Sequence, residues 1–334
     1  MSTINDVAKE AGVSIATVSR YLNSKENVSA QKAKSIEAAV RKLNYQIDSA
    51  AQSLKTGKSY RIGLISPATG PHYWEIISSL ENTLVQSNYY MRMIFTREPK
   101  YNIQRDEILS KIRDVDGSII MPLENKIDKQ VIKALIREKL HFVLVDGLTD
   151  NKNIYQVGVD NFDIGKTAAE ILLKAGHREF LLLTGIEDLS SSYDRILGFR
   201  QALKEYHIEL PEERCIPGDF NPRQILDFLE QDFSKLPPFT AVFSSNDLMA
   251  LAFIKAAEQN NKLSPRDFSI IGVDDLDILP YLSPGLSTFR QPLQIMGTIA
   301  ANMLVSQVEG YNLREKQVVL KAQYIERETV AEVK

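Results

Sequence analysis

The sequence predicts a small all-α helix-turn-helix domain at the N-terminus, followed by an α/β core of two doubly wound parallel-sheet subdomains. The first 58 residues contain short amphipathic helical patterns and nine basic against five acidic residues, a net charge of +4. The rest of the 334-residue chain carries −7. From residue 61 onwards, short apolar runs alternate with amphipathic helical stretches, which is typical of parallel sheets covered by helices on both faces.

The first predicted helix begins after Thr3 and ends at Gly12. Thr3 and Asp6 have the spacing of a capping box, in which each side chain bonds the backbone N–H of the other residue. Apolar residues then recur with the spacing i, i+3, i+4 and i+7, at Ile4, Val7, Ala8 and Ala11. Gly12 ends this helix because glycine accepts the left-handed backbone of a tight C-terminal turn.

Two further helices complete the N-terminal domain, which is predicted to cover residues 1–46. Ser14 is the expected N-cap of a second helix that runs to about Tyr21 or Leu22, with Val18 and Leu22 facing inward. A turn of only three or four residues, including a glycine, joins it to the first helix, which is the helix-turn-helix pattern. Ser29 begins a third helix, whose apolar face closes the core with Ala33, Ile36, Val40 and Leu43.

The helix-turn-helix predicts contact with DNA through the start of its second helix, which lies in the major groove. Arg20 can donate two hydrogen bonds to a guanine, while Ile15 and Ala16 offer apolar contact, for example to a thymine methyl. Side chains suited to phosphate oxygens are Ser14, Thr17, Ser19, Asn23 and Ser29. Serine and threonine at helix starts are also common caps, so the prediction depends on the whole set together with the basic charge.

The segment INDVAKEAGVSIATVSRYLN, followed by VSAQ and KLNY, resembles the DNA-binding domain of the lactose-repressor (LacI/GalR) family of bacterial transcription regulators. Both helix caps, the turn glycine and the Thr-Val-Ser-Arg of the recognition helix stand in the order of the family. The resemblance extends over the whole chain. It implies a core like that of type I periplasmic sugar-binding proteins, and a cytoplasmic, DNA-associated homodimer controlled by a small molecule.

Residues 47–59 are predicted to form a hinge, with a short helix over 49–55 and a linker after it. A helix of about two turns is not stable alone in water, so it should form only against a partner. The resemblance implies that it pairs with its dimer mate in the minor groove, where Leu54 is wedged into a base step. The alternative is a tether in which Leu54 packs on the core. Two departures from the family bear on affinity and operator choice: Ile47-Asp48 replaces the usual Pro-Asn, and Gln52 the usual Arg.

The core is predicted to cover residues 60–334. Its strand-like runs are IGLI, MRMIF, GSIIM, FVLVD, EFLLLTG, TAVFSS and FSIIGVDD, and the helical patterns include 74–88, 163–175, 193–206 and 248–260. About ten strand–helix units are too many for one sheet, so two subdomains are expected. Crossings near Val159, Arg290 and Leu320 divide them into about 60–158 with 291–320 and about 159–290 with 321–334.

The predicted ligand site is the cleft between these subdomains, since ligands lie beyond the carboxyl ends of parallel strands. Polar side chains after the strands could bind neighbouring hydroxyls, and they are Asp146, Asp160, Arg195, Asn246 and Asp274. Aromatic faces for the C–H side of a sugar ring are Tyr73, Trp74 and Phe220. As alternatives, Trp74 could be a core residue, and Asp247 is interpreted as a helix N-cap rather than a ligand contact.

The resemblance to the family adds to this set. It implies that Arg195, in an R-x-x-G pattern, Asn246, in N-D-x-M-A, and Asp274, in G-x-D-D, are polar anchors for the effector. It also adds Gln291, which follows the crossover strand. Most members of the family bind a sugar or nucleoside-type metabolite, and the sequence does not distinguish between these.

No catalytic motif supports an enzyme, and neither a cofactor nor a metal site is predicted. The four histidines lack metal-ligand spacing, and DNFDIGKT fails as a phosphate-binding loop because Asp160 occupies the position of its first glycine. The lone Cys215 is interpreted as a small, half-buried apolar residue that forms no internal disulfide. No run approaches the roughly 18 apolar residues of a membrane span, so no membrane partner is expected.

These features predict a repressor of carbohydrate-metabolism genes that binds a near-palindromic operator as a homodimer and is released by a sugar. A purine- or nucleoside-responsive or corepressor-dependent regulator of the same family is the main alternative. A non-regulatory sugar-binding protein and a sugar- or nucleotide-processing enzyme are others. Because no leucine heptads follow IERETV, a dimer is expected rather than a tetramer tied by heptads.

Overall fold

The structure, a computed structural model, describes residues 2–24, 28–45, 56–66, 72–95, 97–98, 101–102, 105–122, 125–187 and 189–333. The chain divides into two compact units, Met1–Tyr60 and Arg61–Lys334. The predicted hinge helix and Leu54 lie outside the described residues. Within the described residues, no helix is long and apolar enough to cross a membrane.

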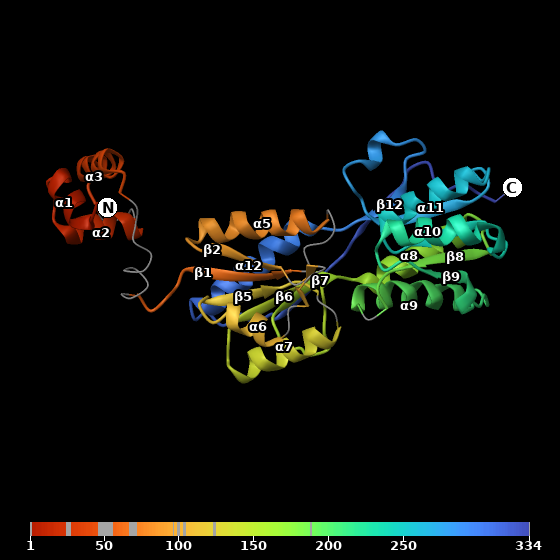
Figure 1. Cartoon of the computed structure of the whole chain (residues 1–334), viewed down its shortest axis with the longest axis horizontal. Helices are drawn as coiled ribbons and strands as arrows, with labels where there is room; N and C mark the ends of the chain where they lie inside the picture. The colour runs from red at the N-terminus through yellow and green to blue at the C-terminus, as the bar shows by residue number, and fades with distance from the viewer. Residues whose placement is uncertain are drawn as a thin grey trace. The chain divides into compact units, whose positions relative to one another are not determined.

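The first unit contains α1 (Ile4–Ala11), α2 (Ile15–Ser24) and α3 (Ala30–Leu43), as predicted (Figure 1). The capping box is confirmed: the Thr3 N–H donates to Asp6 Oδ2 at 2.8 Å, and the Asp6 N–H donates to Thr3 Oγ1. Gly12 ends α1 with a left-handed φ of 64°. Both ends of α1 therefore follow from local chemistry.

The second helix is longer than predicted and has one more inward residue, since Val18 and Leu22 both pack on the core as predicted. It ends at Ser24 rather than at Tyr21 or Leu22, and Tyr21 is buried more deeply than Leu22. Both residues follow Val18 at helical spacing, but the Tyr21 ring fills the core while its hydroxyl reaches out to the Glu37 carboxylate. A short sequence pattern could not distinguish the two.

Three buried side chains, Val7, Val18 and Ile36, bring the helices of this unit together. An ion pair between Lys42 and Glu10, at 2.7 Å, then joins α3 to α1 on the surface. Because that pair is exposed, it contributes only about 0–1 kcal/mol, so the apolar core carries the stability of this domain.

The second unit contains two six-stranded sheets among its described residues. The first is entirely parallel, with the order β13-β7-β6-β5-β1-β2. Its strands are β1 (Arg61–Ser66), β2 (Tyr90–Phe95), β5 (Gly117–Ile120), β6 (Phe142–Val145), β7 (Gln156–Val159) and β13 (Gln317–Leu320). Its helices are α5 (His72–Gln86), α6 (Arg105–Lys111), α7 (Asn125–Arg137) and α12 (Leu293–Val308). A separate antiparallel pair joins β3 (Arg97–Glu98) and β4 (Tyr101–Asn102).

The second sheet has the order β14-β12-β11-β10-β8-β9. Its strands are β8 (Phe180–Thr184), β9 (Cys215–Pro217), β10 (Ala241–Ser244), β11 (Ser269–Asp274), β12 (Ser287–Arg290) and β14 (Gln323–Ile325). Its helices are α8 (Asn161–Lys174), α9 (Ser190–Glu205), α10 (Pro222–Asp232) and α11 (Asp247–Gln259). Short 3-10 turns cover Glu212–Arg214, Phe233–Lys235 and Leu279–Tyr281. The sheet is not wholly parallel, because the edge strand β14 runs antiparallel to β12.

The chain changes sheets three times, after β7, after β12 and after β13. The crossing after β12 is joined to the segment that follows β14 by Asp275, whose buried carboxylate pairs with Arg290 at the end of β12 and with Arg327 after β14. Loss of both arginines would leave the buried Asp275 charge uncompensated, which costs several kcal/mol.

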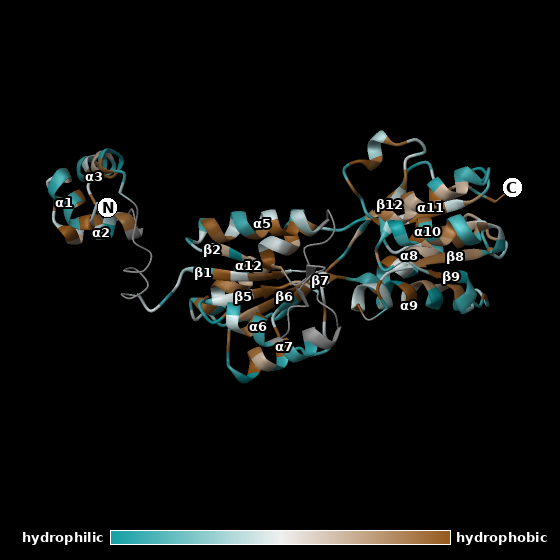
Figure 2. Ribbon diagram, viewed as in Figure 1, coloured by the Kyte–Doolittle hydropathy of each residue, from teal (hydrophilic) through white to brown (hydrophobic). Residues whose placement is uncertain are grey.

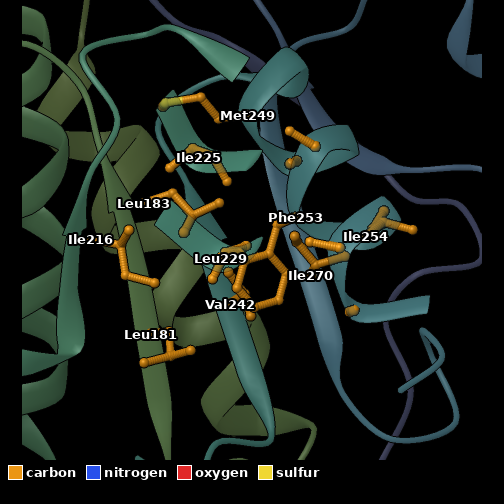
Figure 3. Close-up of a cluster of buried hydrophobic side chains, with 14 of the residues drawn as sticks. Leu181, Leu183, Ile216, Ile225, Leu229, Val242, Met249, Phe253, Ile254 and Ile270 are labelled. Carbon is orange, nitrogen blue, oxygen red and sulfur yellow. The ribbon is translucent and has the colours of Figure 1, made fainter. Parts of the chain in front are cut away.

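The strands of both sheets are strongly apolar, and polar residues lie on the outer sides of the helices (Figure 2). On one face of the second sheet, Leu183, Val242 and Ile270 come from three neighbouring strands and pack against Phe253 of α11 (Figure 3). Phe253 is fully buried. Burial of such a side chain contributes about 1.5–3 kcal/mol, so this layer fixes α11, whose start belongs to the candidate effector site.

Candidate DNA-binding surface and effector site

The second helix of the helix-turn-helix presents the residues predicted to read DNA bases. Ile15 is 49% exposed, and Ala16 and Arg20 are exposed as well. Ala16 and Arg20 lie four positions apart and therefore on the same side of α2, next to Ile15. Val18 and Tyr21 hold the opposite side of the helix in the core, so this surface faces solvent.

The residues predicted to bind phosphate differ in their exposure and in the hydrogen bonds that they already form within the protein. Ser14 caps α2, since its hydroxyl accepts the Thr17 N–H at 3.2 Å and lies 2.8 Å from the Thr17 hydroxyl. Ser29 is exposed at the N-cap position of α3, but its side chain makes no capping hydrogen bond, which leaves its hydroxyl able to turn towards a phosphate. Ser19 is half-buried. Asn23 belongs to α2, and its side chain lies outside the described residues.

Arg195 of α9 lies at the centre of the residues predicted to bind the effector. Its side chain is buried, Nε donates to Asn161 Oδ1 at 2.8 Å, and a terminal nitrogen donates to the Ser245 carbonyl. Burial lowers the pKa of the guanidinium, and the carboxylates of Asp274 and Asp146 oppose that shift. Asp274 ends a strand of the second sheet and Asp146 follows one of the first, so the guanidinium lies near strand ends from both.

A close crossing of α8 and α9 holds Arg195 in place. A Cβ on Gly165 would lie 1.9 Å from the Arg195 carbonyl oxygen, and one on Gly198 would lie 2.1 Å from the Phe162 carbonyl oxygen. The two glycines therefore let the helix backbones touch. Gly165 is the glycine of DNFDIGKT, and Asp160 at its start caps α8 by accepting the Asp163 N–H at 2.9 Å. This segment is a helix start and a packing contact.

The N-cap of α11 is Asn246, so the assignment of that role to Asp247 was wrong. Asn246 Oδ1 accepts the Met249 N–H at 2.9 Å, and its Nδ2 donates to the Phe220 carbonyl at 3.3 Å. Asp247 lies inside the helix and is fully buried, where it accepts the Thr288 hydroxyl at 2.6 Å. Burial and the nearby charge of Asp274 raise the pKa of Asp247 well above its ordinary value. Sequence alone placed the cap one residue late because either residue type can fill it.

Asp274 and Gln291 form a buried pair beside Arg195. Asp274 has a φ of 125°, and its Oδ1 accepts the Gln291 Nε2 at 2.8 Å. Gln291 Oε1 is buried and has no hydrogen-bond partner among the described residues. Arg195, Asp146, Asn246, Asp274 and Gln291 are called the Arg195 cluster below.

The predicted aromatic contacts occupy different environments. The Phe220 ring packs on Gly185, directly after β8, where a Cβ would lie 2.2 Å from the ring. Tyr73 is half-buried, and its hydroxyl is among the groups that influence Arg195. Trp74 is 59% exposed, so it is not a core residue. It lines a pocket of about 900 Å³ together with Asp274 and Ile278.

Sequence reasoning missed several residues of this region. Asn161 and Ser245 orient Arg195 by accepting its hydrogen bonds. Asn161 directly follows Asp160 and Ser245 directly precedes Asn246, so both are next to candidate residues, but their contact with Arg195 depends on the tertiary structure. A second pocket, of about 500 Å³, lies between the ends of β5 and β6 and the start of α9. Its lining residues gave no signal because they come from separate segments and share no local pattern.

Comparisons with known proteins agree with this arrangement. Residues 3–48 match the bacterial regulatory proteins of the lacI family, and residues 169–330 match the periplasmic binding protein-like domain. The HTH-type transcriptional repressor PurR of Klebsiella pneumoniae (strain 342) is 31% identical over 337 residues, which cover 99% of this chain and 98% of that protein. The chain belongs to the LacI family.

Solved structures of transcription regulators share this fold. The lac repressor dimer bound to operator and the anti-inducer ONPF has a TM-score of 0.84 at 24% identity, with 99% of each chain covered. The complex of the transcriptional regulator CelR with cellobiose has a TM-score of 0.74 at 23% identity, with 99% of this chain and all of that chain covered. The predicted fold class is confirmed. This LacI-family chain is a DNA-binding transcription regulator with an effector domain, and the expectation that it is no enzyme is confirmed by its family.

Proposed function

We propose that the chain is a repressor that binds a near-palindromic operator as a homodimer, and that a sugar bound at the Arg195 cluster releases it. The observation that best supports this location of the effector site is the buried Gln291 Oε1 beside Asp274, which has no hydrogen-bond partner among the described residues. A buried polar atom without a partner costs about 1–3 kcal/mol. A ligand hydroxyl that donates to this oxygen removes that cost, which supports a polar ligand at this position.

The chemistry of the cluster favours neighbouring hydroxyls. The carboxylates of Asp146 and Asp274 can accept hydrogen bonds, and the side-chain amide of Asn246 can donate them. The same amide donates to the backbone carbonyl of Phe220, which holds Phe220 beside Asn246. These groups suit a polyol with an apolar C–H face. We include Asp160 and Tyr73 as outer members of this site.

A purine or nucleoside that acts as corepressor is the second candidate. It is favoured by similarity to proteins named as PurR repressors, which reaches 31% identity along nearly the whole chain. The two candidates differ in the sign of their effect: an inducing sugar weakens DNA binding, and a corepressor strengthens it.

The exposed surface of α2 supports the DNA-binding part of the proposal. Arg20, Ile15 and Ala16 would meet base edges, and the hydroxyls of Ser14, Thr17, Ser19 and Ser29, with Asn23, would bind phosphates. Two such domains in a dimer bind half-sites about one DNA turn apart. We propose that Leu54 adds a minor-groove contact.

An exposed apolar patch in the second unit supports the homodimer. Trp74, Ile278, Tyr281 and Leu282 are 59%, 51%, 82% and 36% exposed, and the first two line one pocket. Large apolar side chains with this much exposure are typical of protein–protein contact surfaces. We therefore assign Trp74 to the dimer surface in preference to a direct contact with the sugar.

A screen followed by a DNA-binding assay tests the proposal. The full chain is screened by thermal shift against sugars, sugar phosphates, nucleosides and bases, and its preferred duplex is selected from a randomised library. We expect a sugar to raise the melting temperature and to weaken duplex binding by about 5- to 150-fold, the usual range of allosteric coupling. A purine that tightens binding would support the second candidate instead.

A matched pair of variants locates the site. Asn246→Asp keeps the capping oxygen of α11 but removes the amide donor, so it should spare DNA binding and abolish the response to the ligand. Asn260→Asp makes the same chemical change at the other end of α11 and should respond normally. A normal response from Asn246→Asp would exclude the Arg195 cluster, and absence of any salt-sensitive duplex binding would refute the repressor.

A further inference from the structure

The exposed side of α2 can read bases only if the helix keeps a defined rotation about its own axis. Arg20 donates two hydrogen bonds to a guanine when its planar guanidinium meets the base edge in the right direction. Burial of Val18 holds α2 in the domain, but apolar contact is non-directional and tolerates small rotations. A directional hydrogen bond would fix the rotation more narrowly.

Tyr21 makes such a hydrogen bond, and it directly follows Arg20 on α2. Its ring is only 7% exposed and packs in the core of the domain, so its hydroxyl has little freedom to move. That hydroxyl donates to a carboxylate oxygen of Glu37, an exposed residue of α3. Consecutive residues of a helix point about 100° apart, so a fixed Tyr21 also fixes the direction in which Arg20 leaves the helix.

The charges around this hydrogen bond keep Tyr21 as the donor. The bond to Glu37 raises the pKa of the Tyr21 phenol, so the hydroxyl retains its proton. The positive charge of Arg41 opposes this shift. Arg41 lies four positions after Glu37 on α3, a spacing at which opposite charges attract along a helix.

A second glutamate of the same domain provides a comparison. Glu10 of α1 pairs with Lys42 of α3 at 2.7 Å, and both side chains are exposed. Glu10 and Glu37 thus each connect α3 to one neighbouring helix. They differ in that the partner of Glu37 lies next to a residue expected to read a base.

We propose that Glu37 is a positioning residue for base recognition, which acts through the Tyr21 hydroxyl and sets the direction of Arg20. The inference rests on Arg20 as a base reader, which belongs to the function proposed above. It adds a residue that determines specificity from α3 without touching a base.

Tyr21→Phe is the most direct test, because it removes only the hydroxyl and leaves the ring in the core. The full chain and the variant are compared by binding and sequencing of a randomised duplex library. The base pair read by Arg20 is the one at which Arg20→Ala loses its preference. We expect Tyr21→Phe to reduce the affinity ratio between the preferred and the other base pairs at that position about tenfold, while affinity for an unrelated duplex stays the same.

Variants of the two glutamates provide the controls. Glu37→Ala should reduce the same ratio, and Glu37→Gln, which keeps an acceptor oxygen, should restore part of it. Glu10→Ala removes the same charge and also a contact of α3, and it should leave the ratio unchanged. Because loss of a negative charge strengthens binding to every duplex, the variants are compared by this ratio and not by affinity. A thermal melt of each variant verifies its folding.

The combination of Tyr21→Phe with Arg20→Ala separates positioning from a general loosening of the domain. In a chain that already carries Arg20→Ala, Tyr21→Phe should cause no further loss at this base pair. Full discrimination by Tyr21→Phe, an equal loss at every base pair, or a loss no larger than that of Glu10→Ala would overturn the inference and leave the proposed function intact. If Arg20→Ala itself changes no preference, Arg20 is not a base reader, and the inference fails together with that part of the proposed function.

Discussion

Because α8 and α9 are in contact at Gly165, we expect Gly165→Ala to destabilise the protein, although the change from glycine to alanine in a helix usually stabilises it. Alanine favours a helix interior over glycine by about 1 kcal/mol, so the same change at an open position of a helix stabilises a protein. Here the new Cβ would lie 1.9 Å from the Arg195 carbonyl oxygen, whereas ordinary contact begins at 3.4 Å. The helices would have to separate by about 1.5 Å, and overpacking of this kind costs about 1–3 kcal/mol or more.

Because the clash of about 1.5 Å falls on backbone atoms, the overpacking cost lies in the upper part of that range, about 2–3 kcal/mol, and the net loss in the free energy of unfolding for Gly165→Ala is about 1–2 kcal/mol. For a unit of this size, that loss lowers the melting temperature by about 2–8 °C. Because the clash falls on the backbone of Arg195, affinity for the effector should fall as well. Calorimetric melting and urea titration of the full chain measure the first effect.

Gly285→Ala serves as a control, since a Cβ there would meet side-chain atoms of Arg327 and Glu328 at 3.2 Å instead of backbone at 1.9 Å. This variant should lose less stability than Gly165→Ala. A melting temperature for Gly165→Ala equal to or above that of the unchanged chain would show that α8 and α9 do not touch, and the explanation for the position of Arg195 would be wrong.

Three other predictions concern single side chains. Arg20→Ala should reduce discrimination at one base pair by about 1–3 kcal/mol, measured by binding and sequencing of a randomised duplex library, and an unchanged preference would remove Arg20 from the base-reading set. Tyr281→Asp should convert a dimer to a monomer in sedimentation, because it places a charge in the apolar patch; an unchanged sedimentation coefficient would place the interface elsewhere. The His177 ring forms hydrogen bonds with Thr240 and Ser269, and its burial lowers the pKa of the imidazole below 6.5. As the pH drops through 6.5, the imidazole of the unfolded chain is therefore protonated before that of the folded chain, and the free energy of unfolding should fall. His177→Gln should flatten this part of the urea-stability profile, and equal slopes for both chains would contradict the assignment.

Local chemistry made much of the fold predictable. The capping box of Thr3, the left-handed Gly12 and the apolar runs of the strands each act within a few residues, so their effects can be seen in a short segment. The antiparallel course of β14 was not predictable, because pairing at a sheet edge depends on where the chain has crossed over. The greater burial of Tyr21 than of Leu22 likewise depends on α3, which supplies Glu37.

The order of residues along the chain establishes which residue types follow the strands, and hence the candidates for the effector site. Only the tertiary structure decided how they are used: Asn246 caps α11, Asp247 is buried in a hydrogen bond to Thr288, and Gly165 allows a helix crossing. Likewise, the pocket of about 500 Å³ at the ends of β5 and β6 has no local sequence pattern. The physical reason is that caps and periodicity act over one or two turns, whereas a site forms from contacts between segments far apart in the chain.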